Sequence, residues 1–137
     1  MTNTVLIDTN VILDYVLKRE PFANDALACM ERLFGAKAKV YLTASTITDI
    51  YYLTNKALHD KEKSKDVIAK LLNAFQIAGV DKADCLNALS LPMTDYEDAL
   101  VSTCAKKVRA EFIITRNLSD YKNSPVAAIA PADYLKA

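Results

Sequence analysis

Short apolar runs alternate with longer amphipathic stretches along most of this chain of 137 residues. The runs have the length and residue types of buried strands, whereas the stretches between them repeat apolar residues at helical spacing. Strands that alternate with helices through short connections form a mainly parallel sheet with helices on both faces. Strands are expected at 4–7, 40–43, 112–115 and 126–129, with a weaker candidate at 75–80. Helices are expected at 10–18, 23–34, 45–58, 62–75, 81–91 and 95–110.

The fold class follows from this alternation and from the scarcity of turn-forming residues. The chain has only two glycines and four prolines, which argues against an all-β fold rich in tight turns. We therefore predict an α/β fold: a three-layer α/β/α sandwich with a central, mainly parallel sheet of four to five strands. The length is that of one domain, so residues 1–137 are assigned to a single domain.

The overall charge neither indicates nor excludes a nucleic-acid ligand, because seventeen basic residues balance seventeen acidic ones. The three cysteines form no CxxC pair and lack metal-ligand spacing, as expected for thiols in a reducing compartment. The sequence has neither an N-terminal signal pattern nor an apolar run of membrane-spanning length, so we expect a cytoplasmic protein without a membrane partner.

Acidic residues occur in separate segments, where the predicted strands end or helices begin. Asp8 directly follows the first strand, and Asp49 lies in the first turn or so of the helix after 40–43. Because ligands bind beyond the carboxyl ends of the strands in open parallel sheets, we expect these segments to meet at one edge. The polar residues expected there are Asp8, Asp49, Asp95, Asp98, Thr115, Arg116, Asn117 and Asp120.

Clustered carboxylates of this kind predict a divalent cation. Carboxylates in one place repel one another unless a cation compensates their charge. Mg²⁺ is a hard cation that binds oxygen ligands and keeps several of its waters. Metal-bound water is more acidic than bulk water, and the metal also stabilises charge on a phosphoryl oxygen. The cluster is therefore suited to hydrolysis of a phosphodiester by an activated water.

Each acidic residue also has an explanation that needs no ligand. Asp8 would satisfy free backbone N–H groups if it caps the helix that follows. Asp98 lies three residues after Asp95, a spacing typical of a capping box, and Glu97 lies three residues after a threonine. Asp120 lies in a loop, where aspartates are common. The shared placement of these residues, rather than any one of them, carries the prediction.

Four motifs together extend over nearly the whole chain: "VLIDTNVILDYVLKREPF", "ASTITDIYYLTNKAL", "TDYEDALVSTCAKK" and "FIITRNLSDYKNSPV". They resemble the PIN-domain nucleases, particularly the compact VapC-type toxins of bacterial toxin–antitoxin pairs. The resemblance implies a single PIN domain over 1–137, with a central parallel sheet flanked by helices. It also implies an acidic cluster that binds Mg²⁺ or Mn²⁺ and cleaves RNA.

The resemblance further implies roles for individual residues. Asp8, Asp98 and Asp120 match three of the four acidic positions of the family. Asp49 matches the fourth, where most members have a glutamate, and its shorter side chain would reach a metal through water. All four are expected to be catalytic, with Asp8, Asp98 and Asp49 as the metal ligands. The polar positions that orient ligands or water in the family are matched by Asn10, Thr115 and Asn117.

The resemblance therefore implies a metal-dependent endoribonuclease that acts on RNA and is the toxin of a type II toxin–antitoxin pair. The expected partners are a small antitoxin protein and a second copy of the chain. Arg116 is expected to contact a substrate phosphate, with a solvated surface arginine as the alternative. Two rivals stay open. A catalytically weak PIN domain that binds RNA or regulates a partner is favoured by Asp49. A haloacid-dehalogenase-like phosphatase also begins with a strand ending in aspartate, but Asn10 occupies the place of its general acid.

Overall fold

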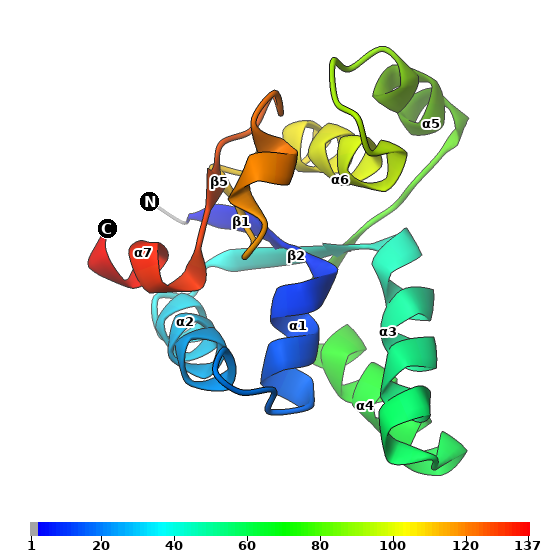
Figure 1. The fold of residues 1–137 in the computed structure, drawn as a ribbon, viewed down its shortest axis with the longest axis vertical. Coiled ribbons are helices and arrows are strands. Elements are labelled where there is room, and N and C mark those ends of the chain that lie inside the picture. Colours follow the sequence, from blue (N-terminus) through cyan, green and yellow to red (C-terminus); the bar gives the residue numbers. More distant parts are fainter. Residues whose placement is uncertain (1–2) are drawn as a thin grey trace.

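The computed structural model describes residues 3–137 and contains one sheet of five parallel strands. The strand order is β3-β2-β1-β4-β5, so the first strand lies at the centre (Figure 1). The prediction of a mainly parallel sheet of four to five strands is confirmed, and the weak candidate at 75–80 contains β3. The strands are β1 (Thr4–Ile7), β2 (Lys39–Thr43), β3 (Gln76–Ala78), β4 (Phe112–Ile114) and β5 (Ala128–Ile129).

Helices cover both faces of the sheet, which confirms the three-layer arrangement. On one face lie α1 (Thr9–Val16), α2 (Ala23–Gly35), α3 (Ala44–Leu58), α4 (Lys61–Ala74) and α7 (Pro131–Lys136). On the other lie α5 (Lys82–Leu89), α6 (Tyr96–Lys107) and the short 3-10 helix η1 (Leu118–Tyr121) (Figure 1). The sequence analysis missed α7 and η1, because elements of six and four residues are too short to show an amphipathic period.

Two hydrophobic cores, one on each face, hold the layers together. Successive side chains of a strand point to opposite faces, so Val5 and Ile7 join one core and Leu6 joins the other. All three are fully buried. The first core packs against α1, α2 and α4, and the second packs against α6 through Val101 and Cys104. The carboxyl end of β1 is therefore fixed between both layers. None of the helices in residues 3–137 has the length and apolar character needed to cross a bilayer.

A chain of threonine hydroxyls sets α3 against α1. Thr43 is the N-cap of α3 and accepts a hydrogen bond from the backbone N–H of Thr46 at 3.2 Å. The Thr46 hydroxyl lies 2.7 Å from that of Thr43 and accepts a hydrogen bond from the Thr9 hydroxyl at 3.3 Å. These contacts fix the start of α3 beside the start of α1, and Asp49 lies in the second turn of α3 rather than the first.

Candidate active site

Asp8 joins β1 to α1, and its backbone N–H and both of its carboxylate oxygens form hydrogen bonds. Its backbone N–H donates to the Ile114 carbonyl at 3.0 Å, which continues the pairing of β1 with β4. One carboxylate oxygen, Oδ1, accepts the Thr9 backbone N–H at 2.9 Å, so Asp8 is itself the N-cap of α1. The other, Oδ2, accepts the Thr115 hydroxyl at 2.8 Å. Asp8 therefore caps α1 and is also available as a member of an acidic site.

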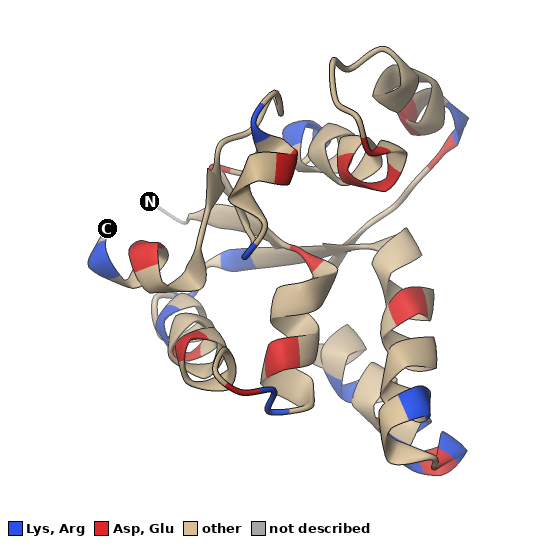
Figure 2. Ribbon diagram, viewed as in Figure 1, with Lys and Arg blue, Asp and Glu red and all other residues tan. Residues whose placement is uncertain are grey.

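A cleft of about 430 Å³ opens beside Asp8 at the carboxyl edge of the sheet. Its walls come from the start of α1, from α3, from the first turn of α6 and from the segment after β4. Figure 2 shows acidic positions on α3, on one face of the sheet, and on α6, on the other, with the acidic segment between β1 and α1 between them. Among the residues that the structure describes, no lysine or arginine lines the cleft. The lining residues are Asp8, Thr9, Asn10, Asp49, Tyr52, Leu53, Asp95, Glu97, Asp98 and Asn117.

Asp98 faces the cleft from the first turn of α6. Asp95, the N-cap of this helix, accepts the Asp98 backbone N–H at 2.9 Å. The Tyr121 hydroxyl donates to Asp98 Oδ1 at 3.3 Å. Partial burial, together with the charges of Asp95 and Asp8, raises the pKa of Asp98 to about 6. Asp98 thus lies in a field of negative charge that favours its protonated form when no cation is bound.

Burial and hydrogen bonds act in opposite directions on the pKa of Asp8. Asp8 is only 8 % exposed, and this burial raises its pKa, although the hydrogen bonds from Thr115 and Thr9 work in the opposite direction. Those hydrogen bonds favour the ionised carboxylate. The structure therefore orients Asp8 as an acceptor in a place where its charge lacks a neutralising partner.

Glu97 is a member of the cleft whose role the sequence analysis missed. It lies beside Asp98 in "EDAL", and its spacing suggested nothing beyond capping. In the structure Glu97 lines the cleft together with Asp49. Burial, and then the charge and hydrogen bond of Asp49, raise the pKa of Glu97. A second carboxyl thus lies next to Asp49, the residue that is one methylene shorter than the usual glutamate.

The predicted supporting residues also lie at the cleft. The Thr115 hydroxyl donates to Asp8 and accepts the Asn117 backbone N–H at 3.0 Å, so it links the end of β4 to the end of β1. Asn10 and Asn117 both line the cleft. Asp120 is exposed on η1 and does not line the cleft, but its charge contributes to raising the pKa values of Asp8 and Asp98.

Arg116 is directed away from the cleft and toward Asp14. Its Nε donates to Asp14 Oδ2 at 2.7 Å, and its guanidinium carbon lies 3.9 Å from the centre of the Phe22 ring. Arg19 donates to the other oxygen of Asp14 at 2.9 Å and to the carbonyl of Asn10 at 3.1 Å. Asp14 is 1 % exposed, so it is a buried carboxylate between two arginines. This contact ties α1 to the segment after β4. A phosphate contact by Arg116 stays a prediction.

The side chains of the cleft fit a hard divalent cation by their chemistry. They offer several carboxylate oxygens, and burial followed by the charges of neighbouring carboxylates raises the pKa values of Asp8, Glu97 and Asp98. A bound cation would stabilise the ionised carboxylates against both effects. Within residues 3–137, no three acidic, histidine or cysteine side chains form a preassembled set of metal ligands. Binding would therefore draw the carboxylates closer together than they lie here.

The raised pKa of Asp98 predicts how the metal-free protein depends on pH. The folded-state pKa of about 6 lies above the ordinary value of 3.8, so between these values the folded protein binds more protons than the unfolded chain. The contribution of Asp98 to stability therefore falls as pH rises through this window. In EDTA, we expect Asp98→Asn to raise the melting temperature by a few degrees at about pH 7.5 and to leave it nearly unchanged at about pH 3, below both pKa values. An equal shift at both pH values would contradict the prediction.

The fold and the cleft together define a parallel α/β protein with an acidic, candidate metal-binding site at the carboxyl edge of its sheet. A family model described as PIN domain matches residues 4–119 of the chain. The chain therefore belongs to the PIN domain family, which confirms the resemblance seen in its motifs. No curated protein matches the chain.

Solved structures with the same fold include proteins of toxin–antitoxin systems. FitAcB from Neisseria gonorrhoeae is 22% identical with a TM-score of 0.71, over 93% of this chain and 98% of that one. A toxin–antitoxin complex from Klebsiella pneumoniae is 20% identical with a TM-score of 0.69, over 93% and 97%. VapC20 of Mycobacterium tuberculosis, a toxin that cleaves the sarcin–ricin loop, is 14% identical with a TM-score of 0.62, over 80% and 86%. At these identities the likeness shows the fold.

Proposed function

We propose that this protein is a metal-dependent endoribonuclease and the toxin of a type II toxin–antitoxin pair. The observation that carries the proposal is the cleft in which Asp8, at the end of the central strand, and Asp98, from α6, face a common space with Asp49 and Glu97. Membership of the PIN domain family and the fold shared with VapC20 support it. The substrate is RNA, and the products carry a 5′-phosphate, as the family resemblance implies.

The residues of the cleft divide the chemistry between them. Asp8 and Asp98 are the principal ligands for Mg²⁺ or Mn²⁺, with Asp49 and Asp120 nearby. When bound, the metal acidifies a water and stabilises charge on the phosphoryl oxygen. Thr115 and the Thr9 backbone N–H hold the Asp8 carboxylate in one orientation. Glu97 would orient the attacking water and accept its proton. Its raised pKa makes it a stronger base than an ordinary glutamate, which suits this role.

The partners follow from the same proposal. A small antitoxin would inhibit the enzyme by covering the acidic cleft, for which a basic segment is the complementary chemistry. The chain would also form a homodimer. A catalytically weak PIN domain is the second candidate, and the specific observation in its favour is Asp49, whose side chain is one methylene shorter than glutamate.

Cleavage of RNA under controlled metal supply tests the proposal. Purified protein is incubated with single-stranded RNA in Mg²⁺, in Mn²⁺ or in EDTA, and the products are separated on a denaturing gel. We expect cleavage with either metal and none with EDTA. Cleavage that persists in EDTA would exclude the metal-carboxylate mechanism. Binding of Mn²⁺ without cleavage of any RNA would favour the weak PIN domain, and hydrolysis of a small phosphomonoester would favour a phosphatase.

A further inference from the structure

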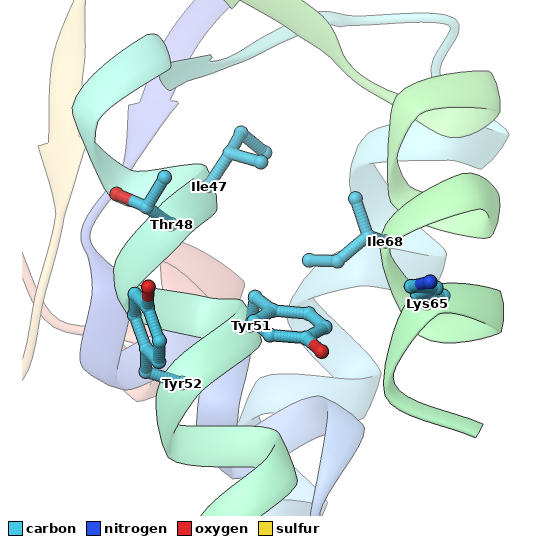
Figure 3. Close-up of a pocket in the computed structure, with 6 residues that line it drawn as sticks. All are labelled: Ile47, Thr48, Tyr51, Tyr52, Lys65 and Ile68. Atoms are coloured by element: carbon cyan, nitrogen blue, oxygen red, sulfur yellow. The ribbon is translucent and has the colours of Figure 1, made fainter. Parts of the chain in front are cut away.

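Tyr52 is an exposed aromatic residue that borders two hollows at once. Tyr52 lies on α3, is 69 % exposed and lines the acidic cleft. It also lines a second groove of about 220 Å³ between α3 and α4. Figure 3 shows its ring lying along α3 beside Thr48, while Tyr51 points across the groove toward Ile68. The Tyr52 ring is therefore a wall shared by the cleft and the groove.

The position of Tyr52 relative to Asp49 is fixed by the helix. Tyr52 and Leu53 follow Asp49 by three and four residues, so all three side chains lie on neighbouring positions of one helical face. The rise from Asp49 to Tyr52 is about 4.5 Å along the axis. An aromatic surface and an exposed leucine thus lie within one turn of a carboxylate of the candidate metal site. Water covers this ring in the isolated protein, although an aromatic side chain gains free energy when it is buried.

The groove beyond Tyr52 combines apolar walls with one cation. Ile47, Tyr51 and Ile68 form the walls, and Lys65 of α4 lies at the rim (Figure 3). The Tyr51 ring meets the Tyr52 ring edge to face, with centroids 5.6 Å apart and planes at 76°. This contact supports the orientation of the Tyr52 ring. Stacking surfaces next to a positive charge are what unpaired nucleic acid requires, because bases stack on aromatic rings while Lys or Arg contacts the phosphates.

We propose that Tyr52 is the stacking platform for the base next to the scissile phosphate, and that the strand continues into the groove, where Lys65 contacts a following phosphate. The proposal rests on the proposed function, because the scissile phosphate is placed in the acidic cleft. A base in a duplex is stacked on its neighbours and has no free face, so the site selects unpaired RNA, such as a loop or a single strand. The volume of the groove, the Tyr52 wall that it shares with the cleft and its lysine favour a nucleotide over a protein helix.

Tryptophan fluorescence measures the stacking directly, because the natural chain contains no tryptophan. Tyr52→Trp introduces a single fluorophore at the platform, and Asp8→Asn in the same chain prevents cleavage. We expect a ten-residue oligouridylate to quench the emission, and an oligomer of the same length without bases to leave it unchanged. Leu89→Trp on α5 is the matched control, since Leu89 is also 69 % exposed but does not line the cleft or the groove. Its emission should not respond.

Affinities in the Asp8→Asn background separate stacking from charge. Tyr52→Ala should weaken binding of the oligouridylate about 10-fold, within the range measured for aromatic residues that stack on bases. Tyr52→Phe keeps the ring and should bind as the parent does. Lys65→Gln should weaken the binding of the oligouridylate and of the oligomer without bases to the same extent. It should also reduce the slope of log affinity against log salt by about 1.

The possible outcomes distinguish a failure of the stacking role of Tyr52 from a failure of the proposed nuclease function. If Tyr52→Ala binds oligouridylate as tightly as the parent and the tryptophan emission does not change, while the wild-type protein still cuts RNA, the platform is wrong and the nuclease stands. If Tyr52→Ala instead alters the molecular mass in sedimentation, the groove is a contact between copies and the platform is likewise overturned. If the wild-type protein neither binds nor cuts RNA, the proposed function fails and the inference fails with it.

Discussion

Asp8→Asn is expected to reduce metal-dependent cleavage of RNA by about 100- to 1,000-fold and to leave the protein folded. Asparagine has nearly the same shape as aspartate and is an equally good N-cap, because its single oxygen can accept the Thr9 backbone N–H. Its amide NH2 can donate to the Thr115 hydroxyl, which keeps this contact with the direction of the hydrogen bond reversed. The substitution therefore removes the charge of the proposed principal metal ligand and keeps the helix and the contact between β1 and the segment after β4. Initial rates at saturating Mn²⁺ measure the loss in cleavage, and thermal unfolding in EDTA measures the fold.

Asp60→Asn is the matched control for this prediction. Asp60 is also an N-cap aspartate, and it accepts the Lys63 backbone N–H at 3.1 Å at the start of α4, outside the cleft. Its substitution makes the same chemical change and should leave cleavage within about twofold of wild type. A similar loss of activity in both variants would assign the effect to helix capping, and an active Asp8→Asn variant would contradict the metal-ligand role.

Asp14→Asn is expected to lower the free energy of unfolding by about 2–3 kcal/mol. Loss of one partner from a buried ion pair costs about 3–5 kcal/mol, because the remaining charge stays desolvated. The cost of Asp14→Asn should lie at or below the lower end of this range, because the side chains of Arg116 and Arg19 are 25% and 37% exposed and would remain partly hydrated. Urea unfolding followed by circular dichroism measures the change.

An exposed ion pair provides the comparison for Asp14. Asp66 and Lys70 form an i,i+4 pair at 3.0 Å on α4, with side chains 63% and 76% exposed. Asp66→Asn should cost less than about 0.5 kcal/mol, because solvent screens such pairs. If the two substitutions destabilise the protein equally, the pairing of Asp14 with its arginines does not contribute as the structure indicates.

The elements of the fold were predictable where their apolar period is long. The spacing in 45–58 and 62–75 located α3 and α4 to within about a residue, because each helix has about four turns over which the pattern repeats. The strand expected at 126–129 is only Ala128–Ile129, since β5 is an edge strand that pairs with β4 over two positions. Such edges depend on tertiary contacts, which leave no period in the sequence.

The acidic cleft was predictable from topology more than from any single residue. Asp8, Asp49 and Asp98 meet because parallel strands bring their carboxyl ends to one edge, and the predicted alternation of strands and helices was sufficient to infer this. Glu97 was missed because an acidic residue three positions after a threonine is already explained as part of a helix cap. The pairing of Arg116 with Asp14 joins residues 102 positions apart, and no local pattern encodes such a contact.

The central position of β1 also has a consequence for the synthesis of the protein. β1 pairs with β4, and the Asp8 carboxylate receives one of its two hydrogen bonds from Thr115, 107 residues later in the chain. A nascent chain that has left the ribosome only as far as α4 has Asp8 and Asp49 but neither α6 nor β4. The cleft is completed only when α6 and the segment after β4 have emerged, so the growing chain holds Asp8 and Asp49 for most of its synthesis without the carboxylates that face them.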